Sequence, residues 1–177
     1  MKKLAFIGFL AILGVIGAGV FFFGGYYSVA GTAGDAAVVD WLLAKVRQSS
    51  IARHATDAPP ASLDDPATVR AGARAYVVRG CVTCHGAPGV TWAKFSEGLR
   101  PDPPDLKALA KDREPQHLFW VIKNGIRMTG MPSFGAIEVP DQEIWSMAAF
   151  IKKLPNVSEA DFKTWSAPPV VTPLPSR

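Results

Sequence analysis

The chain begins with its longest uncharged stretch. Behind Lys2 and Lys3, no charged residue occurs from Leu4 to Tyr27. A helix of that length extends about 36 Å, enough to cross a hydrocarbon core of about 30 Å with some tilt. The lysine pair favours a cytoplasmic N-terminus, so the remainder of the chain is expected on the outer side of the membrane. We therefore interpret residues 1–35 as a transmembrane anchor with its outer flank.

A cleaved signal peptide is the alternative interpretation of this segment. Ser28-Val29-Ala30 resembles a small-residue cleavage site, and a lysine pair is typical of a signal-peptide n-region. The apolar run is longer than the usual signal-peptide core, however, and Tyr26 and Tyr27 suit the aromatic belt at the outer interface. We favour the retained anchor, and both interpretations export the rest of the chain.

Residues 36–65 are expected to form a juxtamembrane helix and a linker. Apolar residues recur at roughly helical spacing from 36 to 53, with charged residues between them. The apolar positions are Val38, Val39, Trp41, Leu42, Leu43, Val46 and Ile51. This face is expected either on lipid or a partner subunit, or packed against the rest of the chain. A Pro-rich linker at 58–62 follows.

Two amphipathic helices are predicted in the body of the chain. The first begins at Pro66, with Asp64 and Asp65 as candidate caps. It continues through Val69, Ala73, Tyr76 and Val77. The second covers 141–151 between Pro140 and Pro155. Its apolar stripe comprises Ile144, Met147, Ala148 and Ile151.

A third helix and a C-terminal tail complete the predicted elements. The helix begins at Pro115 and ends at Asn124-Gly125, where glycine is expected as a left-handed cap. Residues 155–177 contain five prolines, a composition that favours an extended or disordered tail.

The charge distribution argues against nucleic acid as a partner. The formal net charge is +4, but residues 1–53 hold five Lys/Arg against two Asp/Glu, and residues 54–177 hold fourteen against thirteen. The basic excess is therefore N-terminal. The body is nearly balanced and contains no basic stripe, so nucleic-acid binding is not expected.

The strongest chemical signal is Cys81-Val82-Thr83-Cys84-His85. Cys-x-x-Cys-His is the attachment motif of a c-type haem. On a helical turn, thiols three residues apart share a face and can each bond one vinyl group of the same porphyrin. The adjacent His85 can then reach the iron. We expect one covalent haem, because the chain contains two cysteines and one such motif.

Two other interpretations of the cysteine pair are weaker. A thioredoxin-like redox pair is expected within a βαβ pattern, and none surrounds this one. A structural zinc site needs four ligands, and the chain has no third cysteine.

Together, these segments resemble a class I cytochrome c over residues 66–154. In that family the first helix carries a glycine and an aromatic residue four apart, as Gly72 and Tyr76 are here, and crosses the C-terminal helix at that point. The resemblance implies an all-α cytochrome c fold around one covalent haem, preceded in this chain by one transmembrane helix.

The resemblance also implies two further haem contacts. Pro104 in Pro104-Asp105-Leu106 is similar to the family's proline whose carbonyl accepts a hydrogen bond from the proximal His, and Pro88 is the alternative. Thr129-Gly130-Met131-Pro132 resembles the family's distal loop, in which Met131 supplies the second axial ligand. Met128 lacks the flanking Gly and Pro.

Other candidate contacts are weaker. His54 and His117 are expected on helix surfaces rather than on the iron. Trp120 is expected to pack in the haem pocket, and Arg100 and Trp92 are candidates for the haem propionates.

The expected function is one-electron transfer, not enzymatic catalysis. His/Met ligation saturates the iron and favours a relatively high reduction potential. The expected partners are periplasmic or membrane redox proteins. The haem domain is expected to bind them on the outer side of the cytoplasmic membrane. The alternatives are a fixed electron-relay subunit of a membrane oxidoreductase, and a haem enzyme or gas sensor with an open iron site.

Overall fold

The computed structural model describes residues 2–34 and 37–168. Within these ranges the chain forms eight α-helices and three short 3-10 helices, and no strand longer than an isolated bridge between Ala87 and Val90. The all-α prediction is confirmed. The chain divides into two compact units, Met1–Asp35 and Ala36–Arg177.

The first unit contains α1, Lys2–Phe23, which is apolar throughout after its two N-terminal lysines. Its 22 residues extend about 33 Å, long and apolar enough to cross a membrane. The helix ends four residues before the predicted limit at Tyr27. Gly25 adopts a φ of +78°, and the Tyr26 amide bonds back to the Phe21 carbonyl at 3.2 Å. This left-handed glycine ends the helix, so Tyr26 and Tyr27 lie beyond it.

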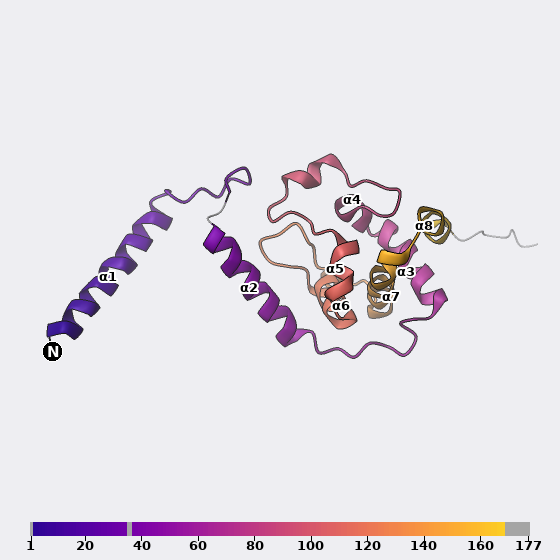
Figure 1. Cartoon of the computed structure of the whole chain (residues 1–177), viewed down its shortest axis with the longest axis horizontal. Helices are drawn as coiled ribbons and strands as arrows, with labels where there is room; N and C mark the ends of the chain where they lie inside the picture. Colours follow the sequence, from indigo (N-terminus) through magenta and orange to yellow (C-terminus); the bar gives the residue numbers. More distant parts are fainter. Residues whose placement is uncertain (1, 35–36, 169–177) are drawn as a thin grey trace, which may run out of the picture. The chain divides into compact units, whose positions relative to one another are not determined.

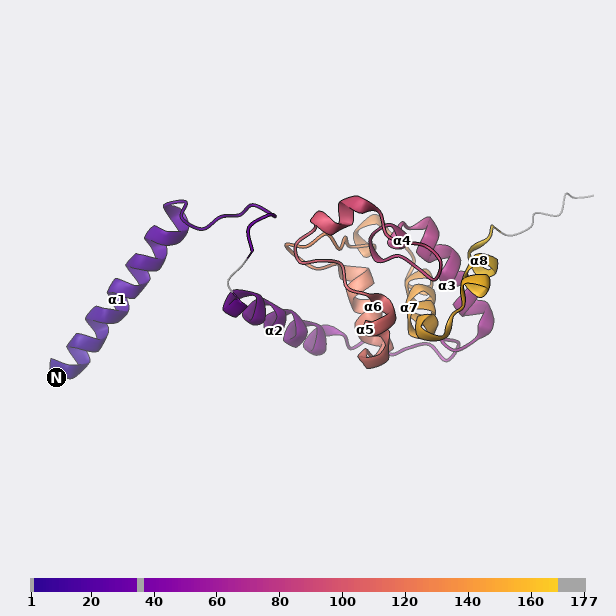
Figure 2. The ribbon, with the colours of Figure 1, turned by 45° about the horizontal axis from the view of Figure 1, so that its top comes forward.

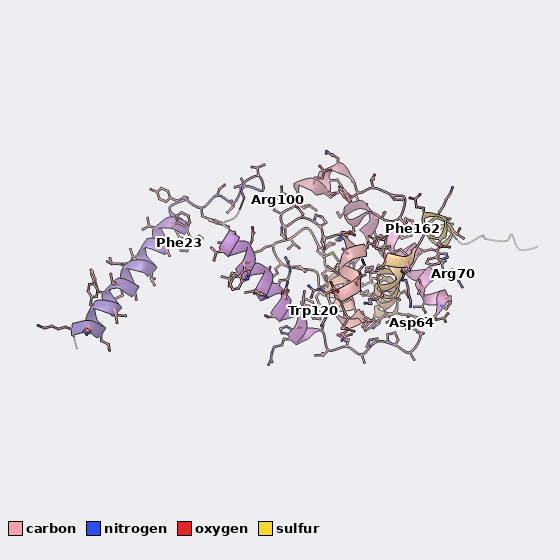
Figure 3. All side chains as sticks on the ribbon, in the orientation of Figure 1. Phe23, Asp64, Arg70, Arg100, Trp120 and Phe162 are labelled. Atoms are coloured by element: carbon pink, nitrogen blue, oxygen red, sulfur yellow. The ribbon has the colours of Figure 1, made fainter. Side chains whose placement is uncertain are left out.

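The second unit begins with α2, Ala37–His54, close to the helix predicted over 36–53. None of its residues is buried. Its C-terminal end packs on α6, Pro115–Asn124, where the rings of His54 and Trp120 stack with centroids 6.2 Å apart. Figure 3 labels Trp120 beside this end of α2. This ring stacking therefore fixes one end of the helix on α6.

The core is built on the crossing of α3, Pro66–Val78, with α7, Asp141–Lys153. Asp65 caps α3 by accepting a 2.9 Å bond from the Ala67 amide. A Cβ atom added to Gly72 would lie 1.9 Å from the Ser146 carbonyl oxygen, so only glycine lets the two backbones approach this closely. All four residues of the predicted α7 stripe are buried.

Helix α7 lies between α3 on one side and α5 and α6 on the other (Figures 1 and 2). Phe119 of α6 stacks on Trp145 of α7 with ring centroids 4.1 Å apart. Helix α5, Leu106–Asp112, was not predicted. Lys152 of α7 holds its end, since its Nζ donates 2.7 Å bonds to the carbonyls of Ala110 and Arg113. Seven residues are too short for a clear helical period.

The predicted tail is wrong in its first part. Residues Glu159–Ser166 form α8, capped by Ser158, whose Oγ accepts a 3.1 Å bond from the Asp161 amide. Phe162, labelled in Figure 3, is buried and stacks on Phe150 of α7. The domain therefore continues past the expected limit at 154. The prolines that suggested an extended tail flank this helix without interrupting it, and residues 169–177 lie outside the described residues.

Candidate haem-binding site

The Cys-x-x-Cys-His motif forms its own short helix, α4, Cys81–His85. It lies between Gly80 and Gly86, whose φ angles are +78° and +63°. One helical turn brings the two thiols to the same face. Both cysteines are free and half-buried. Burial raises the pKa of the Cys81 thiol to about 12, which keeps this side chain neutral.

The His85 ring is held by the loop that follows α4. Its Nδ1 lies 3.0 Å from the carbonyl oxygen of Pro104, directly before the Asp105 cap of α5. Since a carbonyl only accepts, Nδ1 carries the proton in the neutral ring and Nε2 keeps its lone pair. Burial lowers the pKa of His85 and so favours this neutral form. The arrangement leaves Nε2 free to bind a metal, and Pro104 rather than Pro88 makes the contact.

The backbone behind His85 is held from the core. The Tyr76 hydroxyl donates a 2.8 Å bond to the Gly86 carbonyl, and the Tyr76 side chain is fully buried. Burial raises the pKa of this phenol well above its ordinary value, so it stays a donor. The sequence pointed to Tyr76 for packing only. Its hydroxyl at a buried helix position is the signal that could have indicated a polar partner.

The predicted Met131 loop packs against the loop that follows α4. A Cβ atom added to Gly130 would lie 2.8 Å from Leu99 Cδ1, so the two loops touch there. They lie side by side in Figures 1 and 2. The Ile126 amide donates to the Met131 carbonyl at 3.2 Å, and Ser133 Oγ donates to the Lys123 carbonyl at 2.7 Å. These bonds tie the loop to the end of α6.

The two methionines of this loop occupy different environments. Met131 is half-buried and packs against the core, whereas Met128 is 95% exposed. Gly125, where α6 ends, has a φ of +66° and a ψ of −171°. It thus has the expected positive φ but not the left-handed helical conformation. A Cβ atom there would lie 2.7 Å from the Pro132 carbonyl carbon, so glycine also provides the room for this loop.

The weaker candidates have partners of their own. His54 Nδ1 lies 2.8 Å from the Ser50 carbonyl, and Trp120 stacks on His54. Arg100 donates to the carbonyls of Glu97 and Leu99 and pairs with Asp102. The Arg100 guanidinium therefore contacts residues of its own loop.

The residues present fit a c-type haem. The donor set comprises two free thiols on one helical turn, an imidazole with Nε2 available, and a half-buried thioether on a neighbouring loop. Both Cys81 and Met131 belong to a set of apolar residues that pack on the core while staying partly exposed, which suits a flat apolar macrocycle. The other members of the set are Leu63, Val82, Ala87, Leu109 and Trp165.

An all-α domain with this helix crossing and this donor set defines a c-type cytochrome. Residues 67–151 match the family model described as "Cytochrome C oxidase, cbb3-type, subunit III". This match runs from the start of α3 almost to the end of α7, and these residues accordingly form a cytochrome c domain, a class that binds haem and transfers electrons. No curated protein and no solved structure matches the chain.

Proposed function

We infer that this cytochrome is a membrane-anchored, mono-haem carrier of single electrons. The observation that best supports this is the presence of two candidate iron ligands: His85, whose ring contacts the Pro104 carbonyl, and the half-buried Met131. Such a pair saturates the iron, which suits electron exchange rather than substrate binding. When bound, the haem supplies one-electron exchange between ferric and ferrous iron.

Each proposed site residue has a separate task. The sulfur atoms of Cys81 and Cys84 would bond the two vinyl groups and so hold the macrocycle permanently. His85 Nε2 and the Met131 sulfur would bind the iron. The Pro104 carbonyl fixes the tautomer and orientation of the imidazole, an outer contact of the kind that tunes a metal's properties. A single motif and two cysteines in the whole chain support one haem.

The proposed location is the cytoplasmic membrane, with the haem domain on its outer, periplasmic side. Lys2 and Lys3 form the N-terminal end of α1, ahead of its apolar residues, and basic residues tend to remain cytoplasmic. The proposed partners are redox proteins of the membrane or periplasm, which dock transiently through a small surface.

The carrier proposal is tested by the access of small ligands to the iron. The full chain, purified with haem and reduced, is mixed with carbon monoxide and followed by its visible spectrum. A carrier with both axial positions filled binds carbon monoxide slowly or not at all. Rapid stoichiometric binding by the wild type contradicts the carrier and favours an enzyme or gas sensor.

A fixed relay subunit of a membrane oxidoreductase is the second candidate. It is favoured by the oxidase-subunit description of the matched family model and by the exposed helix α2. Purification after gentle solubilisation separates the two candidates. A stoichiometric complex that survives size-exclusion chromatography supports the subunit, and a monodisperse single chain supports the shuttle.

A further inference from the structure

Helix α2 presents a row of apolar side chains to solvent. Val38, Trp41, Leu42 and Val46 are 67%, 60%, 53% and 58% exposed. Their spacing of three and four residues brings them to one face of the helix. Helix α7 buries eight of its residues, whereas α2 buries none. The second unit therefore leaves these apolar side chains of α2 uncovered.

The apolar face of α2 also carries two basic residues. On the helical wheel Lys45 lies between Trp41 and Val38, and Arg53 lies between Leu42 and Val46; both are exposed. Asp40 and Arg47 fall on the opposite side. The apolar face thus carries only basic charge, and long basic side chains can place their charged ends at the edge of an apolar layer. This combination suits a surface of anionic lipid headgroups.

The connection to α1 favours lipid over a soluble partner. Helix α1 ends at Phe23 and α2 begins at Ala37. Residues 24–36 between them span at most roughly 45 Å when fully extended. If α1 is retained in the membrane, as the proposed function holds, the bilayer surface is always within reach of α2, whereas a soluble protein must first be encountered.

We propose that α2 lies along the outer surface of the membrane, with Val38, Trp41, Leu42 and Val46 at the acyl boundary and Lys45 and Arg53 at anionic headgroups. Because His54 and Trp120 pack the end of α2 on α6, this docking sets the orientation of the haem unit to the membrane plane. Only part of the haem domain then faces soluble partners. The inference deepens the proposed function and rests on it.

Site-directed spin labelling of the full haem-loaded chain tests the docking. Leu42→Cys carries the nitroxide on the apolar face, and Asp40→Cys is the matched control on the opposite face of the same turn. Cys81 and Cys84 are held by the haem, so only the new thiol is labelled. The vesicles contain phosphatidylcholine, alone or with anionic phosphatidylglycerol.

In the anionic vesicles, the Leu42 label should collide several-fold less often with a water-soluble nickel chelate than the Asp40 label, and more often with oxygen. The difference should shrink in phosphatidylcholine alone and in a Lys45→Glu/Arg53→Glu variant. If the double charge reversal unfolds α2, both labels become equally mobile, and the spectral line shapes reveal this. The single substitution Lys45→Glu then repeats the test.

Two results would overturn the proposal, and a third would separate the docking of α2 from the membrane anchor. Equal nickel access at both positions, in a chain that floats with the vesicles, overturns docking and leaves the anchor intact. Dipolar broadening between Leu42 labels assigns the face to a second copy and also overturns it. If carbonate removes the chain from vesicles, the anchor fails, and the Leu42 label beside the same vesicles still decides whether α2 binds lipid.

Discussion

The Tyr76 hydroxyl and the Gly86 carbonyl oxygen form a 2.8 Å hydrogen bond that links helix α3 to the residue after His85. Tyr76 lies one helical turn from Gly72, where α3 contacts α7 most closely. The peptide behind the proposed iron ligand is therefore attached to the central helix crossing. The Tyr76 bond holds the backbone next to His85 from the core, and the Pro104 carbonyl holds the His85 ring from the loop.

Replacing Tyr76 by Phe should destabilise the haem-loaded domain. The ring can keep its packing on Phe150, but the buried Gly86 carbonyl loses its donor, which costs about 1–3 kcal/mol. Guanidinium denaturation measures the change. Thr164→Val is the control, because it removes a hydroxyl-to-carbonyl bond of 2.9 Å at an exposed position and should change little. Equal stabilities of Tyr76→Phe and wild type would show that water replaces the hydroxyl.

Substituting Gly72 by Ala should be more harmful than its single methyl group suggests. The added atom meets backbone, the Ser146 carbonyl, which cannot move without separating α3 from α7. Overpacking of this kind costs about 1–3 kcal/mol or more. Gly98→Ala meets nothing within 4 Å and serves as the control in the same denaturation experiment. A neutral Gly72→Ala variant would contradict the close crossing.

Haem attachment should depend on both thiols of α4. Wild-type protein should retain peroxidase-active haem after denaturing gel electrophoresis, and the Cys81→Ala/Cys84→Ala variant should lose it, because no other cysteine can form the thioether bonds. The membrane-fraction yield of the polypeptide serves as a control for expression. Extraction of wild-type haem into acidified ketone would disprove covalent attachment.

The two methionines of the distal loop should behave differently. Met131→Ala should abolish the weak charge-transfer absorption of ferric iron–thioether ligation. It should also lower the reduction potential, because a thioether favours reduced iron, and it should admit carbon monoxide to the ferrous protein. Met128→Ala, at a residue that is 95% exposed, should leave the band in place. A band that persists in Met131→Ala and disappears in Met128→Ala would reverse the assignment.

Helix α8 should contribute to the stability of the haem domain. Phe162→Ala removes a buried ring that stacks on Phe150, at a cost of about 3–5 kcal/mol. Calorimetry of the haem-loaded chain measures this loss. Lys163→Ala, at the next and exposed position, should be nearly neutral. If both variants melt alike, α8 is not part of the cooperative domain.

Several features of this protein follow from the sequence by itself. The haem-attachment motif can be recognised from the spacing of its residues alone. Two thiols three residues apart and an adjacent imidazole lie on one helical turn, wherever that turn is placed in the fold. The apolar run of α1 is recognised by its length, whereas the stripes of α3 and α7 repeat over enough residues to show their period. Asp65 and Pro66 mark the start of α3. These are short-range properties, which depend on neighbours along the chain.

Only the tertiary structure decided which faces are covered. Helix α8 is short, and its place in the domain depends on Phe162 meeting Phe150 from a distant helix. Val38, Trp41, Leu42 and Val46 of α2 share one helix face and are exposed, whereas the apolar stripe of α7 is buried. The Tyr76 bond to Gly86 requires a specific approach of α3 to α4. Such contacts depend on how helices meet in space, and periodicity along a chain carries no information about the partner.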